Sequence, residues 1–198
     1  MINATWSENV ILVDADYVDK VAFDLIVNFE RMLERRIPPA DMARWLDCVA
    51  LDGGLRPAEN SQSQNEIQVV LIHSHKQPQL DNFRPARYTD ELDRKAFTDN
   101  IGEFQISSVS AENMVSTTDL FIDSLQIISN AKEVKRLMAI GNTYEAANAI
   151  RQALRHAHDE QHITLFSMQP QPGGNYRQEI LGYSLMAALG IQSKEVIK

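Results

Sequence analysis

The chain has 198 residues, of which 44% are hydrophobic and 23% are charged, a composition that is typical of globular proteins and excludes a disordered or fibrous chain. A single domain of this length buries roughly 70% of the surface of its unfolded chain, so its core needs no structural metal, and the single cysteine, Cys48, excludes an intramolecular disulfide. A net charge of −8 opposes non-specific nucleic-acid binding through the overall field. With neither a secretion signal nor a membrane-spanning apolar stretch in the sequence, we expect one cytoplasmic domain over residues 1–198.

The first predicted elements are a strand and two helices. The unbroken aliphatic run at residues 10–13 predicts a strand that is covered on both faces. Apolar residues then recur every three or four positions from Val18 to Leu33, which predicts an amphipathic helix with Asp16 as its N-cap. A second helix is predicted to follow two prolines, to bury Trp45 and to end at two glycines, residues 53–54.

The middle of the chain predicts two more strands with irregular segments around them. Residues 56–66 are polar and aperiodic, which predicts a mobile surface loop. Residues 67–73 and 104–109 are predicted strands. Between these strands we expect an irregular segment over residues 75–87 and a short polar helix over residues 89–100.

The last third of the chain predicts three helices and two strands. The first helix has Thr117 or Thr118 as its N-cap. The apolar run 137–140 is followed by a capping-box pattern, Asn142 to Glu145, which opens a helix through residue 154. Residues 163–167 predict the fifth strand, and a final helix is expected from about residue 176 to residue 189, ending at Gly190.

Five short strands separated by helices predict an α/β fold. The expected architecture is a three-layer sandwich with a mainly parallel five-stranded sheet of Rossmann-like type, because each parallel crossover needs a helix-sized connection. In such open sheets, ligands bind beyond the carboxyl ends of the strands, near the point where the strand order reverses. This rule directs attention to the polar residues that follow the predicted strands.

Two groups of acidic residues are candidates for a site. Asp14 and Asp16 directly follow the first strand, where carboxylates can hold a divalent cation or a ligand hydroxyl. Asp119 and Asp123 are four residues apart and lie on one face of a predicted helix. The alternative is structural: Asp14 ends the strand, Asp16 caps a helix, Asp119 interacts with the helix dipole, and Asp123 is solvated.

The turn at residues 141–145 and a basic cluster are the remaining candidates. Gly141, Asn142, Thr143 and Glu145 lie between a strand and a helix, where backbone amides can hold an anion, although helix capping alone also explains Asn142 and Glu145. Basic side chains gather between residues 84 and 95 and predict a phosphate-binding rim, unless they are only a solvated surface. The cluster consists of Arg84, Arg87, Arg94 and Lys95.

The order of strands and acids resembles the PIN-like superfamily, particularly its NYN group of metal-dependent ribonucleases. The resemblance is carried by Asp14 in Ile-Leu-Val-Asp-Ala-Asp-Tyr and by Asp119 and Asp123 in a later helix. It implies a PIN-like fold, catalytic roles for Asp14, Asp119 and Asp123, and Mg²⁺ or Mn²⁺ held by Asp14 and Asp119. We further expect a small bacterial family that supplies no activity to carry over.

The chain departs from that family at its last acidic turn. A Ser-Gly-Asp-Ser-Asp-Phe type segment of the family aligns with residues 140–145, where Asn142 and Tyr144 replace both aspartates and Glu145 is the only nearby acid. Two-metal phosphodiester hydrolysis needs several carboxylates. We therefore predict a partly eroded acidic cleft that binds a nucleotide, nucleic acid or small ligand without robust catalysis.

Two alternatives are retained. The first is a ribonuclease dependent on Mg²⁺ or Mn²⁺, in which Asp14, Asp119 and Asp123 act on RNA guided by the basic cluster. The second is a protein-interaction module or homodimer that docks through Tyr183, Met186 and Leu189 of the last helix.

Overall fold

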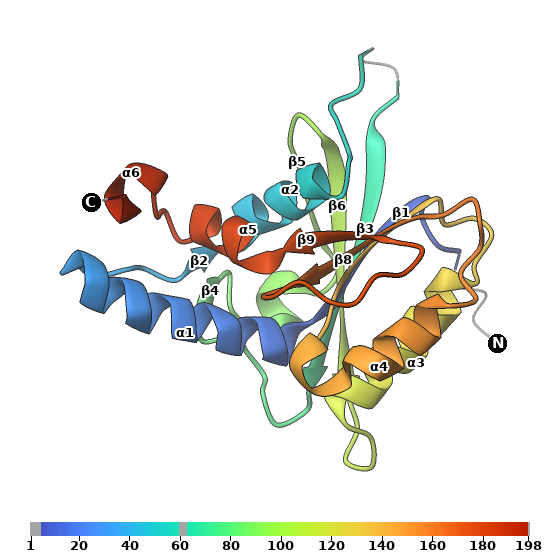
Figure 1. Ribbon diagram of the computed structural model, residues 1–198, viewed down its shortest axis with the longest axis horizontal. Coiled ribbons are helices and arrows are strands. Elements are labelled where there is room, and N and C mark those ends of the chain that lie inside the picture. The colour runs from blue at the N-terminus through green and yellow to red at the C-terminus, as the bar shows by residue number, and fades with distance from the viewer. Residues whose placement is uncertain (1–4, 60–62, 198) are drawn as a thin grey trace.

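A seven-stranded sheet runs through the computed structural model, which describes residues 5–59 and 63–197 (Figure 1). Its strand order is β5-β6-β3-β1-β7-β8-β9, and all neighbours pair in parallel except β5, which is antiparallel to β6. The strands are β1 Asn9–Asp14, β3 Asn65–Ser74, β5 Lys95–Thr98, β6 Gly102–Ala111, β7 Arg136–Ile140, β8 His162–Ser167 and β9 Arg177–Ile180. A separate two-stranded sheet pairs β2 Ala40–Asp41 with β4 Phe83–Arg84.

Helices cover both faces of the sheet (Figure 1). Helices α1 Ala15–Leu33, α2 Met42–Asp52 and α5 Leu181–Ala188 pack on one face, around Trp45. Helices α3 Thr117–Ser129 and α4 Thr143–Leu154 pack on the other face, around Phe121. A π-helix, η1 Tyr88–Leu92, and a short α6 Ser193–Val196 complete the described elements. No helix in the described residues is long and apolar enough to cross a membrane.

The predicted α/β class with a mainly parallel sheet is confirmed, and all five predicted strands are present. The prediction of five strands is wrong because the sheet has seven. The polar helix predicted over residues 89–100 is replaced by η1 and β5, and the start of the predicted last helix is the edge strand β9. The two strands that were not predicted, β5 and β9, are short and lie at the edges of the sheet. Their sequences favour a strand only weakly, and pairing with the neighbouring strand determines their conformation.

Two predicted helix caps are also wrong. Asp14, rather than Asp16, is the N-cap of α1, and its carboxylate accepts from the Tyr17 N–H at 3.2 Å. Ser116, rather than Thr117 or Thr118, caps α3. In both cases the helix begins earlier than its apolar stripe, and a stripe marks the buried face of a helix but not its first residue.

Other predicted boundaries are confirmed. Half of the predicted capping box is present: Asn142 caps α4 and accepts from the Glu145 N–H at 3.2 Å, and no return bond to the Glu145 carboxylate is found among the described residues. Gly190 follows α5 with a φ of 72°, a left-handed conformation that favours glycine. The predicted loop over residues 56–66 is described only in part, because residues 60–62 lie outside the described residues and β3 already begins at Asn65.

The strand order reverses beside β1. The chain passes from β1 outward to β3 and β6, then returns to the other side of β1 to form β7 and continues outward to β8 and β9. The carboxyl ends of β1 and β7 therefore flank the switch point of the sheet, which is the place where open α/β sheets bind ligands.

Candidate functional site

A cavity of about 470 Å³ opens at the carboxyl ends of β1, β7 and β8, and we call it the edge pocket. Its walls come from three segments that are far apart in the sequence. They are Tyr17, Lys20, Val21 and Asp24 of α1, residues 142–145 at the start of α4, and Met168, Gln169 and Gln171 of the β8–β9 connection. The switch-point rule thus points to a real cavity that converging polar groups line.

The sequence around the strand ends shapes this pocket. Helix α1 follows β1 without a loop, because Asp14 both ends the strand and caps the helix. At the end of β7, a Cβ on Gly141 would overlap the buried ring of Phe121. Glycine at this position lets the turn approach α3 closely, and Asn142 then starts α4 beside the pocket.

Asp14 is the buried acid of the site. Its side chain is only 2% exposed. Burial, together with the charges of Asp16 and Glu145, raises the pKa of Asp14 from its ordinary value of 3.8 to about 6, against the opposing hydrogen bond from the Tyr17 N–H. Asp14 therefore titrates near neutral pH, where most carboxyl groups are fully ionised.

Asp16 connects three elements at the same edge of the sheet. Its Oδ2 accepts from the Ser74 N–H at 3.0 Å and from the Thr117 hydroxyl at 3.1 Å. These partners lie at the end of β3 and the start of α3. Asp16 therefore links the start of α1 to the end of β3 and to the start of α3, and it does not line the edge pocket.

Of the other predicted acidic residues, Glu145 and Asp119 line a common cavity, whereas Asp123 does not. Glu145 lines both the edge pocket and a neighbouring groove between α3 and α4. Asp119 lines that groove, so the chain places it near Glu145, whose charge also acts on Asp14. Asp123 is exposed on α3 and lines neither cavity.

These acids do not form a ligand set for a metal ion. Within residues 5–59 and 63–197, no group of three or more His, Cys, Asp or Glu side chains is placed to hold one. Asp14 is engaged as a helix cap, and the carboxylate of Asp16 is held by two donors. The pair that was expected to hold Mg²⁺ or Mn²⁺, Asp14 and Asp119, thus belongs to no such group in the described part of the chain.

The predicted basic rim lies outside the edge pocket. The Arg84 guanidinium donates to the Phe83 carbonyl at 2.7 Å. Arg87 forms exposed ion pairs with Asp90 at 3.3 Å and with Glu91 at 3.9 Å. Both arginines are satisfied within their own segment, so the structure gives them no part in the edge pocket.

Sequence reasoning missed the far wall of the pocket. Lys20 and Asp24 lie one and two turns beyond Tyr17, on the same face of α1. The sequence shows this helical spacing, which would have allowed Lys20 and Asp24 to be included among the candidate site residues. No sequence signal predicted that the β8–β9 connection would fold back to supply Met168, Gln169 and Gln171.

The expected docking face on the last helix is not formed as predicted. Leu189 is only 2% exposed and belongs to the core, because α5 packs against α2 and the sheet. Met186 is half-buried against the same core, and Tyr183 alone of the three is exposed. The three side chains therefore do not share one exposed surface.

A family model matches almost the whole chain. The family model described as "Family of unknown function (DUF6621)" matches residues 3–196. No curated protein and no solved structure matches the chain.

Proposed function

The chain belongs to the family of unknown function DUF6621, and we propose from its own geometry that it is a ligand-binding α/β domain that holds a nucleoside in the edge pocket without robust catalysis. The observation that carries the proposal is the position of this cavity. It lies at the switch point of a mainly parallel sheet, and polar side chains from three distant segments converge on it. Its volume of about 470 Å³ falls within the range of small-ligand sites.

The wall chemistry suits a ligand that carries hydroxyl groups and a flat polar ring. The carboxylates of Asp24 and Glu145 are acceptors for ribose hydroxyls. The side-chain amides of Gln169 and Gln171 both donate and accept, as the edge of a nucleobase requires, and Asn142 adds amide donors while its oxygen caps α4. Tyr144 is 93% exposed at the rim and offers a face on which a base can stack.

The charge of the pocket favours a nucleoside over a nucleic-acid strand. Two carboxylates, Asp24 and Glu145, face one ammonium group, Lys20, and the buried Asp14 lies nearby. A chain of phosphates would meet net repulsion at this edge of a protein whose total charge is −8. The resemblance to the PIN-like superfamily and the ribonuclease activity it implies stay predictions.

The test is a titration of the isotope-labelled protein with adenosine, guanosine, cytidine and uridine, followed by amide chemical shifts. We expect at least one nucleoside to shift the signals of residues 142–145 and 168–171. Glu145→Gln removes one charged acceptor, and affinity should fall about tenfold. Asp123→Asn is the matched control, because it removes one exposed carboxylate that lies outside the pocket.

Two results would overturn the proposal. One is the absence of any shift in these segments at millimolar nucleoside. The other is binding that Glu145→Gln and Asp123→Asn change equally, since that outcome would reflect net charge rather than the pocket.

A further inference from the structure

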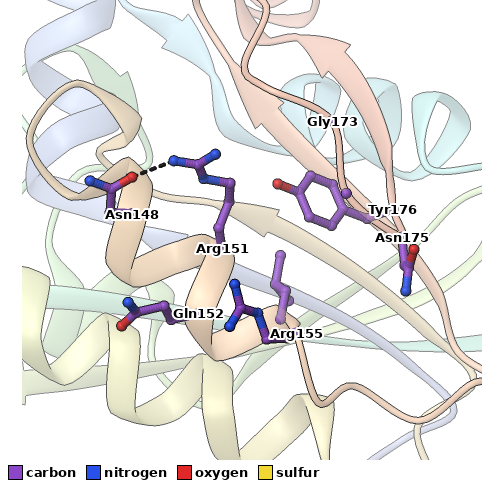
Figure 2. Close-up of a pocket in the computed structure, with 9 residues that line it drawn as sticks. Asn148, Arg151, Gln152, Arg155, Gly173, Asn175 and Tyr176 are labelled. Carbon is purple, nitrogen blue, oxygen red and sulfur yellow. Dashed lines mark hydrogen bonds between the residues drawn. The ribbon is translucent and has the colours of Figure 1, made fainter.

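A second cavity, of about 450 Å³, lies between α4 and the end of the β8–β9 connection, and we call it the arginine pocket (Figure 2). Arg151 in the last turn of α4 and Arg155 at its C-cap are four residues apart, so both extend from one side of the helix end. Tyr176 faces them from the connection, and Asn175 lines the outer side of the cavity. The arginine pocket shares no lining residue with the edge pocket.

The charge of this pocket is opposite to that of the whole chain. Two guanidinium groups line it together with side-chain amides, and its lining contains no carboxylate, although the chain has 27 Asp and Glu residues. In the described part of the chain, neither Arg151 nor Arg155 is in an ion pair. Arg151 donates to the side-chain oxygen of Asn148, a neutral acceptor that leaves its charge uncompensated.

The Tyr176 hydroxyl is an unused hydrogen-bonding group in the same place. It is buried and has no hydrogen-bond partner among the described residues. Its ring is held by the apolar cluster of α3 and α4 and by Gly174, where a Cβ would overlap the ring. Figure 2 shows the hydroxyl directed toward the Arg151 side chain. Buried polar groups of folded proteins are normally paired, so an unpaired hydroxyl beside two guanidinium groups without ion pairs points to a ligand at this place.

We propose that the arginine pocket binds the phosphate group of a small phosphorylated molecule. Guanidinium groups bind phosphate through two parallel N–H donors. The Tyr176 hydroxyl adds a neutral donor from the opposite wall. A phosphate monoester has three terminal oxygens, which matches donors that arrive from both walls better than a carboxylate does. The inference does not depend on nucleoside binding, because the two pockets have separate walls.

The experiment titrates the labelled full-length chain with inorganic phosphate, ribose 5-phosphate and ribose. We expect both phosphate-bearing probes, but not ribose, to shift the signals of residues 148–155 and 173–176. Tighter binding of ribose 5-phosphate than of inorganic phosphate indicates a phosphorylated ligand. The reverse order indicates a site for the free anion and overturns the proposed ligand class.

Two double variants separate the pocket from a general effect of charge. Arg151→Gln with Arg155→Gln should weaken phosphate binding more than about tenfold. Arg31→Gln with Arg36→Gln makes the same change in net charge at exposed positions outside the pocket and should leave the affinity unchanged. Equal losses in both variants, or no shift with millimolar phosphate, overturn the proposal.

A conservative variant guards against misfolding of the double variant. Tyr176→Phe keeps the partly buried ring and removes only the hydroxyl. We expect phosphate to bind this variant severalfold more weakly while the circular dichroism spectrum stays that of the original chain. An unchanged affinity would show that the Tyr176 hydroxyl does not contact the anion and would overturn its assigned role.

Discussion

The two pockets lie along the same helix and differ in charge. The first turn of α4 supplies Glu145 to the acidic edge pocket, whereas its last turn supplies Arg151 and its C-cap residue supplies Arg155 to the arginine pocket. Glu145 and Arg151 are only about 9 Å apart along the helix axis, given a rise of 1.5 Å per residue. The β8–β9 connection forms one wall of each pocket.

This charge order also suits the helix itself. The helix dipole stabilises an acid in the first turn and a base in the last turn, so Glu145 and Arg151 have structural reasons to stand where they do. What distinguishes each pocket is therefore a buried polar group that the dipole of α4 does not explain. In the edge pocket this group is Asp14, with its raised pKa, and in the arginine pocket it is the unpaired hydroxyl of Tyr176.

The largest expected effect is on the pH dependence of stability through Asp14. Its folded-state pKa of about 6 lies above its ordinary value of 3.8, so the folded state binds more protons between these values and the free energy of unfolding falls as pH rises through this window. Above pH 7 the ionised carboxylate destabilises the fold by about 3 kcal/mol. Asp14→Asn keeps an acceptor for the Tyr17 N–H and should gain about this amount at about pH 8 in urea unfolding.

The same unfolding series includes its own control. Asp47 also has a pKa of about 6, raised by burial and by the side chain of Asp99, and its titration contributes to the original chain and to the variant alike. The difference between the two chains therefore isolates Asp14. If Asp14→Asn loses stability at high pH, or keeps the full slope, burial does not destabilise the ionised form of Asp14.

The next largest effect compares one glycine from each pocket region. Gly141→Ala should destabilise the fold by about 2 kcal/mol, because the added methyl group overlaps the buried Phe121 ring. Gly173→Ala, at the arginine pocket, should be nearly neutral because nothing lies within 4 Å of the new Cβ. Thermal unfolding of both variants checks this pair, and equal shifts in Tm would contradict the close approach of the β7–α4 turn to α3.

A smaller effect is expected from one hydroxyl at each pocket. Tyr176→Phe should stabilise the unliganded fold by about 1 kcal/mol, because it removes a buried hydroxyl that has no partner among the described residues. Tyr144→Phe, at the rim of the edge pocket, should change nothing measurable, since Tyr144 is 93% exposed. Chemical denaturation gives both values, and a loss of stability in Tyr176→Phe would show that its hydroxyl is already satisfied.

Local pattern predicted the central part of the fold. Strands β1, β3, β7 and β8 are buried on both faces of the sheet. Such strands have nearly continuous aliphatic sequences, and these runs can be recognised from the sequence alone. Strand β9 has the sequence Arg-Gln-Glu-Ile, and three polar residues of four give no strand signal. Its strand conformation comes from pairing with β8 at the edge of the sheet, which only the tertiary structure supplies.

The candidate site, like the fold, was predicted only in its central part. Asp14 and residues 141–145 follow strands, so the rule for parallel sheets located them near the edge pocket. Their partners across the pocket, such as Gln171, come from an irregular connection whose path has no periodic signal. Arg151 and Arg155 are four residues apart in the sequence, but they were not among the predicted site residues. Tyr176 was expected at the start of the last helix, whereas it precedes β9 and lines their pocket.

Salt should separate the two pockets in the final comparison. Phosphate binding in the arginine pocket depends on the attraction between charges near the surface. Added salt weakens this attraction, because the Debye length falls to about 3 Å at 1 M and charges farther apart than this are largely screened. Raising NaCl from low to near-molar concentration should weaken phosphate binding about fivefold, since Arg151 and Arg155 are the main attraction. Nucleoside binding involves a neutral ligand and should change little, as calorimetric titration of both ligands across the same salt series will show. If salt weakens both ligands equally, the opposite charges of the two pockets do not govern what each of them binds.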